Sequence, residues 1–190
     1  MYQCPKEGGI HLHDCQIASG LEAHSCHSCG GLWIPSATYL PWQQQQADGD
    51  ASPTVGLLPL ALYTSFQASP LDSRAALCPD CHSYLVRGRI NLRQGTVYLE
   101  RCPNCQGIWC DGGEWDLLQE LGLQAHVDYI FSPEWQAQVR HLEAVEREHQ
   151  ALMDRLGPEI TQRLLELSHL LQHHDYADFA VAYLMRRCDR

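Results

Sequence analysis

Two Cys-x-x-Cys pairs constrain the fold of this chain more than any other feature of its sequence. They are Cys78-Pro-Asp-Cys81 and Cys102-Pro-Asn-Cys105, separated by about twenty residues, a spacing typical of a structural zinc site. We expect each pair to form a tight turn whose sulfurs point inward and face backbone N–H groups, with a β-hairpin between the two turns. The sequence therefore predicts a zinc-held hairpin with four ligands: Cys78, Cys81, Cys102 and Cys105.

The charge of the chain disfavours one broad class of partner. Its 190 residues contain 13 Lys and Arg against 23 Asp and Glu, a formal charge of −10, and Lys6 is the only lysine. Four thiolates around one Zn²⁺ would add further negative charge. Such a chain is repelled by a phosphate backbone unless one face is locally basic, so we expect a protein partner rather than nucleic acid.

The cysteines also indicate a compartment. No apolar leader separates Met1 from the first cysteine motif, and the Cys-x-x-Cys pairing favours metal binding in a reducing environment over disulfides. The longest apolar run, Leu57–Tyr63, is too short to cross a bilayer. We therefore expect a cytoplasmic protein with no membrane span.

Residues 1–42 resemble a degenerate copy of residues 78–121. Cys4-Pro5 matches the start of the first pair, and Cys26-His-Ser-Cys29-Gly-Gly-Leu-Trp33 matches Cys102–Trp109. An internal repeat is the simplest explanation. It predicts a second zinc site with Cys4, Cys26 and Cys29 as ligands.

The fourth ligand of this second site stays open at the level of sequence. Glu7 stands where the other copy has Cys81 and could supply a carboxylate oxygen. His24 precedes Cys26 by two residues, and His11, His13 and Cys15 lie further along the expected first strand. The alternative is a weak or empty site in a hairpin that folds on its partner.

The segments around the second cysteine unit follow from their patterns. Residues 43–76 read as a linker with an apolar segment at Leu57–Phe66. Residues 77–122 form the second unit, in which residues 82–101 are a hairpin turning at Gln94-Gly95. One hairpin face is expected to be apolar and the other basic. A helix follows, with Asp111 as N-cap and Glu114 completing a capping box, and it ends at Gly122.

Residues 132–190 are expected to be a helical tail. Ser132-Pro133 is typical of a helix start, and Gly157-Pro158 interrupts the apolar periodicity that follows. A third helical segment begins near Asp175. The predicted fold is therefore small α+β: two zinc-held hairpins followed by an α-helical hairpin with a short third helix.

The second unit resembles a bacterial zinc-ribbon family named after the transcription factor IIB ribbon. That family has Cys-Pro-x-Cys, a hairpin, then Cys-Pro-x-Cys-Gly-Gly-x-Trp-Leu-Asp-x-Gly-Glu-Leu. Here the second half reads Cys102-Pro-Asn-Cys105-Gln-Gly-Ile-Trp-Cys-Asp-Gly-Gly-Glu-Trp115. The resemblance implies a zinc ribbon ligated by the four cysteines of the two pairs. The first copy lacks the Asp-x-Gly-Glu tail, and Cys110 is expected to be a spare, packed thiol.

These features favour a non-catalytic zinc-binding adaptor or assembly factor that binds a protein through its ribbon surfaces and helical tail. The alternative is a nucleic-acid or transcription-machinery factor that uses the hairpin arginines Arg87, Arg89 and Arg93 together with Arg101. A zinc enzyme is disfavoured, because catalytic zinc needs an open position and the four-cysteine site has none. Metal or redox sensing at the degenerate first site is a further hypothesis.

Overall fold

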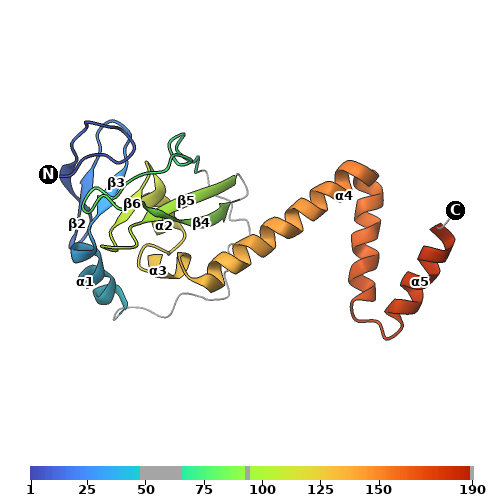
Figure 1. Cartoon of the computed structure of the whole chain (residues 1–190). Helices are drawn as coiled ribbons and strands as arrows, with labels where there is room; N and C mark the ends of the chain where they lie inside the picture. The colour runs from blue at the N-terminus through green and yellow to red at the C-terminus, as the bar shows by residue number, and fades with distance from the viewer. Residues whose placement is uncertain (48–65, 93–94, 189–190) are drawn as a thin grey trace. The chain divides into compact units, whose positions relative to one another are not determined.

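The computed structural model describes residues 1–47, 66–92 and 95–188. The chain divides into two compact units, Met1–Arg140 and His141–Arg190. The first unit contains an antiparallel sheet with helices, and the second is helical (Figure 1). The prediction of a small α+β protein is confirmed at this level. The predicted apolar segment Leu57–Phe66 falls outside the described residues except for Phe66.

The first unit is built on one six-stranded antiparallel sheet with the order β1-β2-β3-β6-β5-β4 (Figure 1). The order is mirrored: three strands from the N-terminal segment meet three from the Cys78–Cys110 segment. The strand bounds are β1 His13–Ala18, β2 Leu21–Ser25, β3 Leu32–Ile34, β4 Val86–Leu92, β5 Gly95–Arg101 and β6 Ile108–Cys110.

The two halves of the sheet join where β3 pairs with β6. Trp33 lies opposite Trp109 in the register, and both indoles are fully buried. The joint needs glycine on both sides, since a Cβ at Gly31 would overlap the Trp109 ring and one at Gly107 would overlap the Trp33 ring. Two Gly-x-Trp sequences thus interlock across the centre of the sheet.

The β4–β5 hairpin follows the predicted alternation in part. Ile90 and Leu92 are buried as expected, whereas Tyr84 and Val86 are 75% and 44% exposed. The apolar face is covered only toward the hairpin tip, because the end of β4 near the cysteines lies outside the main core.

Helices cover the sheet and complete the main core. They are α1 Ser36–Ala47, α2 Glu114–Glu120, α3 Val127–Ile130 and the first two turns of α4 Pro133–Leu171. Trp42, Trp115 and Trp135 are buried in this core. The helix α1 continues through Ala47, into the segment that the sequence indicates as linker, and Gln43 donates a hydrogen bond to the Ala125 carbonyl.

The start of α2 differs from the prediction. The helix begins at Glu114, and its N-cap is Gly113 in the left-handed conformation (φ 85°), not Asp111. The Asp111 carboxylate instead accepts a hydrogen bond of 2.7 Å from the Trp109 indole N–H. Half of the predicted capping box persists, since Glu114 Oε2 accepts the Asp111 backbone N–H at 2.7 Å.

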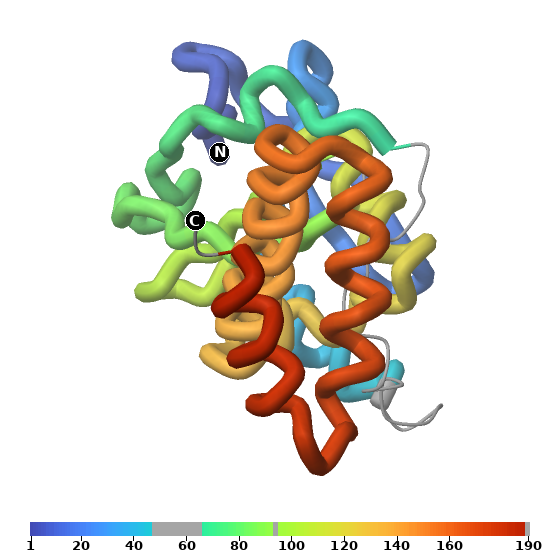
Figure 2. Tube along the Cα trace, turned by 90° about the vertical axis from the view of Figure 1, so that its right-hand side faces the viewer, coloured from blue at the N-terminus to red at the C-terminus, as the bar shows by residue number. Residues whose placement is uncertain are grey.

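The second unit contains the rest of α4 and α5 Ala177–Cys188. The predicted start of α4 is confirmed by a 3.1 Å bond from the Trp135 N–H to the Ser132 hydroxyl. The predicted break is also present, because Gly157 has φ 77° and ψ 166° inside α4. Figures 1 and 2 show the chain reversing between α4 and α5, yet α5 has no buried residue. Among the residues described, no helix has both the length and the apolar character to span a bilayer.

Candidate metal centres

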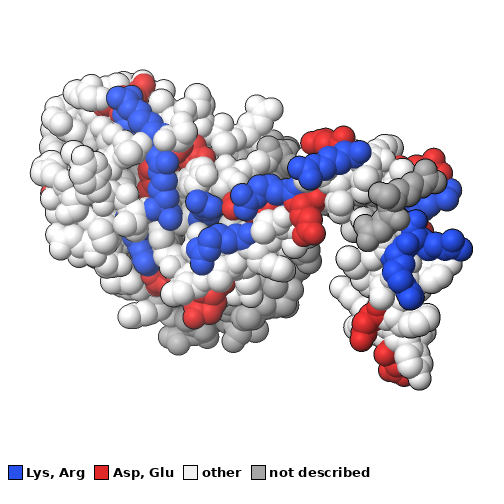
Figure 3. Space-filling model, turned by 45° about the vertical axis from the view of Figure 1, so that its right-hand side comes forward, with Lys and Arg blue, Asp and Glu red and all other residues white. Residues whose placement is uncertain are grey.

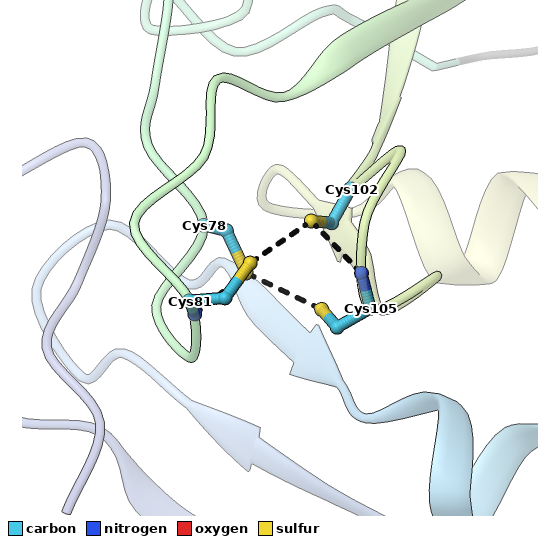
Figure 4. A group of neighbouring side chains, drawn as sticks. All are labelled: Cys78, Cys81, Cys102 and Cys105. Atoms are coloured by element: carbon cyan, nitrogen blue, oxygen red, sulfur yellow. Dashed lines mark hydrogen bonds between the residues drawn. The ribbon is translucent and has the colours of Figure 1, made fainter.

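The four cysteines of the two Cys-x-x-Cys pairs converge at one end of the β4–β5 hairpin (Figure 4). Their sulfurs all lie within 4.8 Å of one another. The Cys78 and Cys105 sulfurs are 3.5 Å apart, and those of Cys81 and Cys102 are 3.3 Å apart. A tetrahedral zinc with Zn–S bonds of about 2.3 Å requires sulfur–sulfur separations of about 3.8 Å. The cluster therefore needs only a small expansion to take Zn²⁺.

The local turns explain why the sulfurs point inward. The N–H groups of Asp80 and Cys81 donate to the Cys78 sulfur at 3.4 Å, and the Cys105 N–H donates to the Cys102 sulfur at 3.4 Å. The residue after each pair, His82 or Gln106, has a positive φ of 59° or 64°. That conformation closes the turn, because the N–H group of this residue donates a hydrogen bond of 3.0 Å to the carbonyl of Cys78 or Cys102, the first cysteine of the pair.

The electrostatics of this cluster favour a cation at its centre. Burial raises the pKa of the Cys78 thiol, whereas hydrogen bonds with Ser83, Asn104 and Cys102 lower the pKa of Cys81 to about 5. Four thiolates this close repel one another unless a positive charge lies between them. A divalent ion would satisfy all four sulfurs and leave no open coordination position.

A second cluster is formed by residues of the N-terminal segment, which supplies strands β1, β2 and β3. Ligand atoms of Cys4, Glu7, Cys26 and Cys29 all lie within 4.8 Å of one another. The sulfurs of Cys4 and Cys29 are 3.7 Å apart, and the Cys26 sulfur lies 3.8 Å from Glu7 Oε2. The three cysteines predicted here are thus brought together, with a carboxylate beside them.

The other candidates for the fourth ligand lie elsewhere. His24 Nδ1 pairs with the Asp14 carboxylate at 2.8 Å, and the His13 ring packs edge-on against His27. Cys15 packs at the margin of the main core. Within the described part of the chain, none of these side chains, nor His11, belongs to the cluster.

The thiols of the second cluster are also in a buried setting. Burial raises the pKa of Cys4 and of Cys29. Burial acts in the same direction on Cys26, but backbone N–H groups of Cys29 and Ser28 outweigh it and lower the pKa of that thiol. All ten cysteines of the chain are free of disulfides, so both clusters keep the thiols that a metal requires.

The two clusters share one buried apolar group. Cys4, Cys26, Cys78 and Cys102 pack with Leu12 around the paired indoles of Trp33 and Trp109. The tryptophans are therefore the common wall of both centres, and each belongs to a Gly-x-Trp sequence that closely follows Cys26–Cys29 or Cys102–Cys105.

Lys6 is an important residue whose role the sequence does not indicate. Its side chain is fully buried, and its Nζ lies 2.8 Å from Glu100 Oε2 and 3.4 Å from Asp111 Oδ2. It also donates to the carbonyls of Arg74 and Leu71 at 2.7 and 3.3 Å. The Cys4–Glu7 turn is thereby tied to the Cys78–Cys110 half by a buried ion pair.

Carboxylates surround this lysine in excess. Asp72, Asp111 and Glu114 are buried with oxygens within 4.8 Å of one another. Burial raises the pKa of Asp72 to about 6, and burial with the neighbouring Asp111 and Asp72 charges raises the pKa of Glu114 well above its usual range. Both shifts follow from placing several carboxyl groups together away from solvent.

The hairpin arginines are engaged within the chain. Arg87 Nε lies 3.3 Å from Glu100 Oε1, and Arg101 forms an ion pair with Asp128 while stacking on Phe131. Figure 3 shows basic side chains next to acidic ones over the face drawn. Arg93 falls outside the described residues. Among the described residues, the positive charge of the predicted arginine face is therefore partly neutralised by carboxylates.

Comparison of the chain with protein-family models, with curated proteins and with solved structures finds no match. The geometry of the two clusters is thus the main guide to what the chain does. Cys110 is fully buried in the main core and is not part of either cluster.

Proposed function

We propose that this chain is a non-catalytic, zinc-stabilised adaptor or assembly factor that binds a protein partner. The observation that carries the proposal is the closed group of Cys78, Cys81, Cys102 and Cys105, whose four sulfurs could saturate a tetrahedral ion. A saturated zinc has no position for a substrate or a reactive water, so it acts by holding structure.

We infer that the sheet comprises two zinc ribbons, the first with a changed ligand set. The mirrored strand order β1-β2-β3-β6-β5-β4 supports this inference. So does the reciprocal packing of Gly31 on Trp109 and of Gly107 on Trp33. Pairing the ribbons through β3 and β6 would bury one edge of each and make a single rigid platform.

The helical unit is the proposed partner-binding element. Its large apolar side chains remain exposed, most strongly Tyr176 (72%), Leu170 (71%) and Phe179 (68%). Soluble proteins rarely leave such a group uncovered without a binding role. A protein with an apolar helical or grooved surface would bury it. The nucleic-acid alternative has less support, because Arg87 and Arg101 already pair with carboxylates.

The zinc part of the proposal is tested by elemental analysis of the purified protein. We expect bound zinc that is lost from the four-cysteine site in Cys102→Ser, while the control Cys15→Ser keeps the wild-type content. A wild-type protein that folds without zinc would overturn the proposal.

The adaptor part is tested by quantitative co-purification from cells. A stoichiometric partner should accompany the wild type and the polar control Gln162→Ala, and should be lost from Leu170→Ser combined with Phe179→Ser. Circular dichroism checks that the helices persist. Purification of the wild type as a lone monomer would contradict the proposal.

A further inference from the structure

We propose that Glu7 is the fourth ligand of a Cys₃Glu zinc site, and that this makes the N-terminal site the exchangeable one. The inference rests on the proposed zinc binding, and it assigns the ligand and the behaviour of one site. It predicts two zinc ions in the same chain with different rates of release.

The first argument is the equivalence of position. In the four-cysteine site, the Cys81 N–H donates to the Cys78 sulfur at 3.4 Å. In the N-terminal site, the Glu7 N–H donates to the Cys4 sulfur at 3.3 Å. The backbone therefore presents Glu7 to its cluster as it presents Cys81, and only the ligand atom differs.

The second argument is distance. With bonds of about 2.3 Å to sulfur and about 2.1 Å to oxygen, a tetrahedral zinc separates sulfur and oxygen by roughly 3.6 Å. Glu7 Oε2 lies 3.8 Å from the Cys26 sulfur. The same geometry requires sulfurs about 3.8 Å apart, and those of Cys4 and Cys29 are 3.7 Å apart.

The third argument concerns the neighbouring lysine. Lys6, the only lysine of the chain, is adjacent in sequence to Glu7. Its ammonium group is fully buried and pairs with Glu100 and Asp111. Among the described residues no Lys or Arg pairs with the Glu7 carboxylate, which lies 3.8 Å from the Cys26 sulfur, where a bound cation would neutralise it.

The difference in ligand predicts the difference in stability of the two sites. Both clusters have two buried and two partly exposed ligands, so solvent access does not distinguish them. Thiolate is the softer ligand and favours zinc, whereas carboxylate suits harder ions. A site with three thiolates and one carboxylate should release zinc before a site with four thiolates.

The test is a competition with a colorimetric zinc chelator on the full-length protein. The wild type should release one zinc quickly and one slowly. Glu7→Cys should recreate the Cys81 position and slow the fast phase, and Glu7→Gln should speed it. Loss of an outer partner alone changes metal affinity about 10–100-fold, so we expect each change to be at least tenfold. Glu22→Gln, at an exposed position on β2, is the matched control.

Cobalt substitution provides a second readout that does not depend on release. Each Co²⁺–thiolate bond contributes to the ligand-to-metal charge-transfer absorption, so Glu7→Cys should increase that absorption and Glu7→Gln should not. Unchanged release and unchanged spectra in both variants would overturn the assignment of Glu7. A wild type with a single zinc, held by the four cysteines, would also overturn it, together with the changed ligand set inferred for the first ribbon, but would leave the proposed zinc-stabilised adaptor role intact.

Discussion

Lys6 shows at the scale of one residue how the two halves of the sheet depend on each other. Its ammonium group is fully buried with Glu100 and Asp111, far in sequence from the turn that carries it. A buried ion pair adds little to stability over an apolar pair, but removing one partner leaves an uncompensated charge. Lys6 is therefore more sensitive to substitution than its position in a surface-like turn suggests.

We predict that Lys6→Met lowers the free energy of unfolding by about 3–5 kcal/mol, because Glu100 and Asp111 would lose their buried counter-charge. Denaturant titration followed by tryptophan fluorescence measures the change. The double variant Lys6→Met with Glu100→Gln should recover part of the loss. A single variant as stable as the wild type would show that the ion pair is unimportant.

Asp72 provides a residue-scale prediction about pH. Burial raises its pKa from 3.8 to about 6 in the folded protein, so between these values the folded state binds more protons than the unfolded state. The contribution of Asp72 to stability therefore falls as pH rises through this window.

Replacing Asp72 by Asn removes the free-energy cost of keeping an ionised carboxylate buried in the folded protein. Relative to wild type, Asp72→Asn should gain up to about 3 kcal/mol at pH 8 and little at pH 4, since one pKa unit is worth about 1.4 kcal/mol. The measurement is the free energy of unfolding of both proteins at each pH. Because the two proteins are compared at the same pH, effects of pH on zinc binding cancel in the difference between them. An equal gain at both pH values would contradict the explanation.

At the scale of elements, the β3–β6 joint is the feature on which the first unit is organised. The strands are short, with three residues each, so backbone hydrogen bonds alone hold them weakly. The interlocked indoles of Trp33 and Trp109 supply the packing. The glycines that face them are needed for space, not for backbone freedom.

We predict that Gly31→Ala and Gly107→Ala each destabilise the protein by about 1–3 kcal/mol or more, because a methyl group there overlaps a buried indole. Gly8→Ala is the control, as nothing lies within 4 Å of a Cβ at that position. Thermal unfolding compares the three variants. Tolerance of both substitutions at the joint would mean that the indoles repack.

At the scale of the whole molecule, the tryptophans report on one unit only. All five, Trp33, Trp42, Trp109, Trp115 and Trp135, lie in Met1–Arg140. Two of them, Trp33 and Trp109, pack directly with the cysteines of both clusters. The emission of Trp33 and Trp109 should therefore respond to changes at the two cysteine clusters.

We predict that removing both zinc ions shifts the tryptophan emission to longer wavelength and lowers the midpoint of thermal unfolding of this unit, because Trp33 and Trp109 pack directly with the metal-binding cysteines. Restoring zinc should reverse both effects. An unchanged emission spectrum in protein shown to be free of metal would contradict the role of zinc in the fold.

The amino-acid sequence by itself determined the features that depend on neighbouring residues. The spacing in Cys78–Cys81 and Cys102–Cys105 gives tight turns with inward sulfurs, and Ser132-Pro133 and Gly157-Pro158 start and interrupt α4. These features are local because a turn, a cap or a break is decided by a few consecutive backbone dihedrals.

Tertiary structure alone decided the features that join distant segments. It placed Glu7, rather than a nearby histidine, beside the three N-terminal cysteines. It also buried Lys6 against Glu100 and Asp111, and it paired β3 with β6. Such choices follow from the packing and charge balance of many residues at once, which no single stretch of sequence contains.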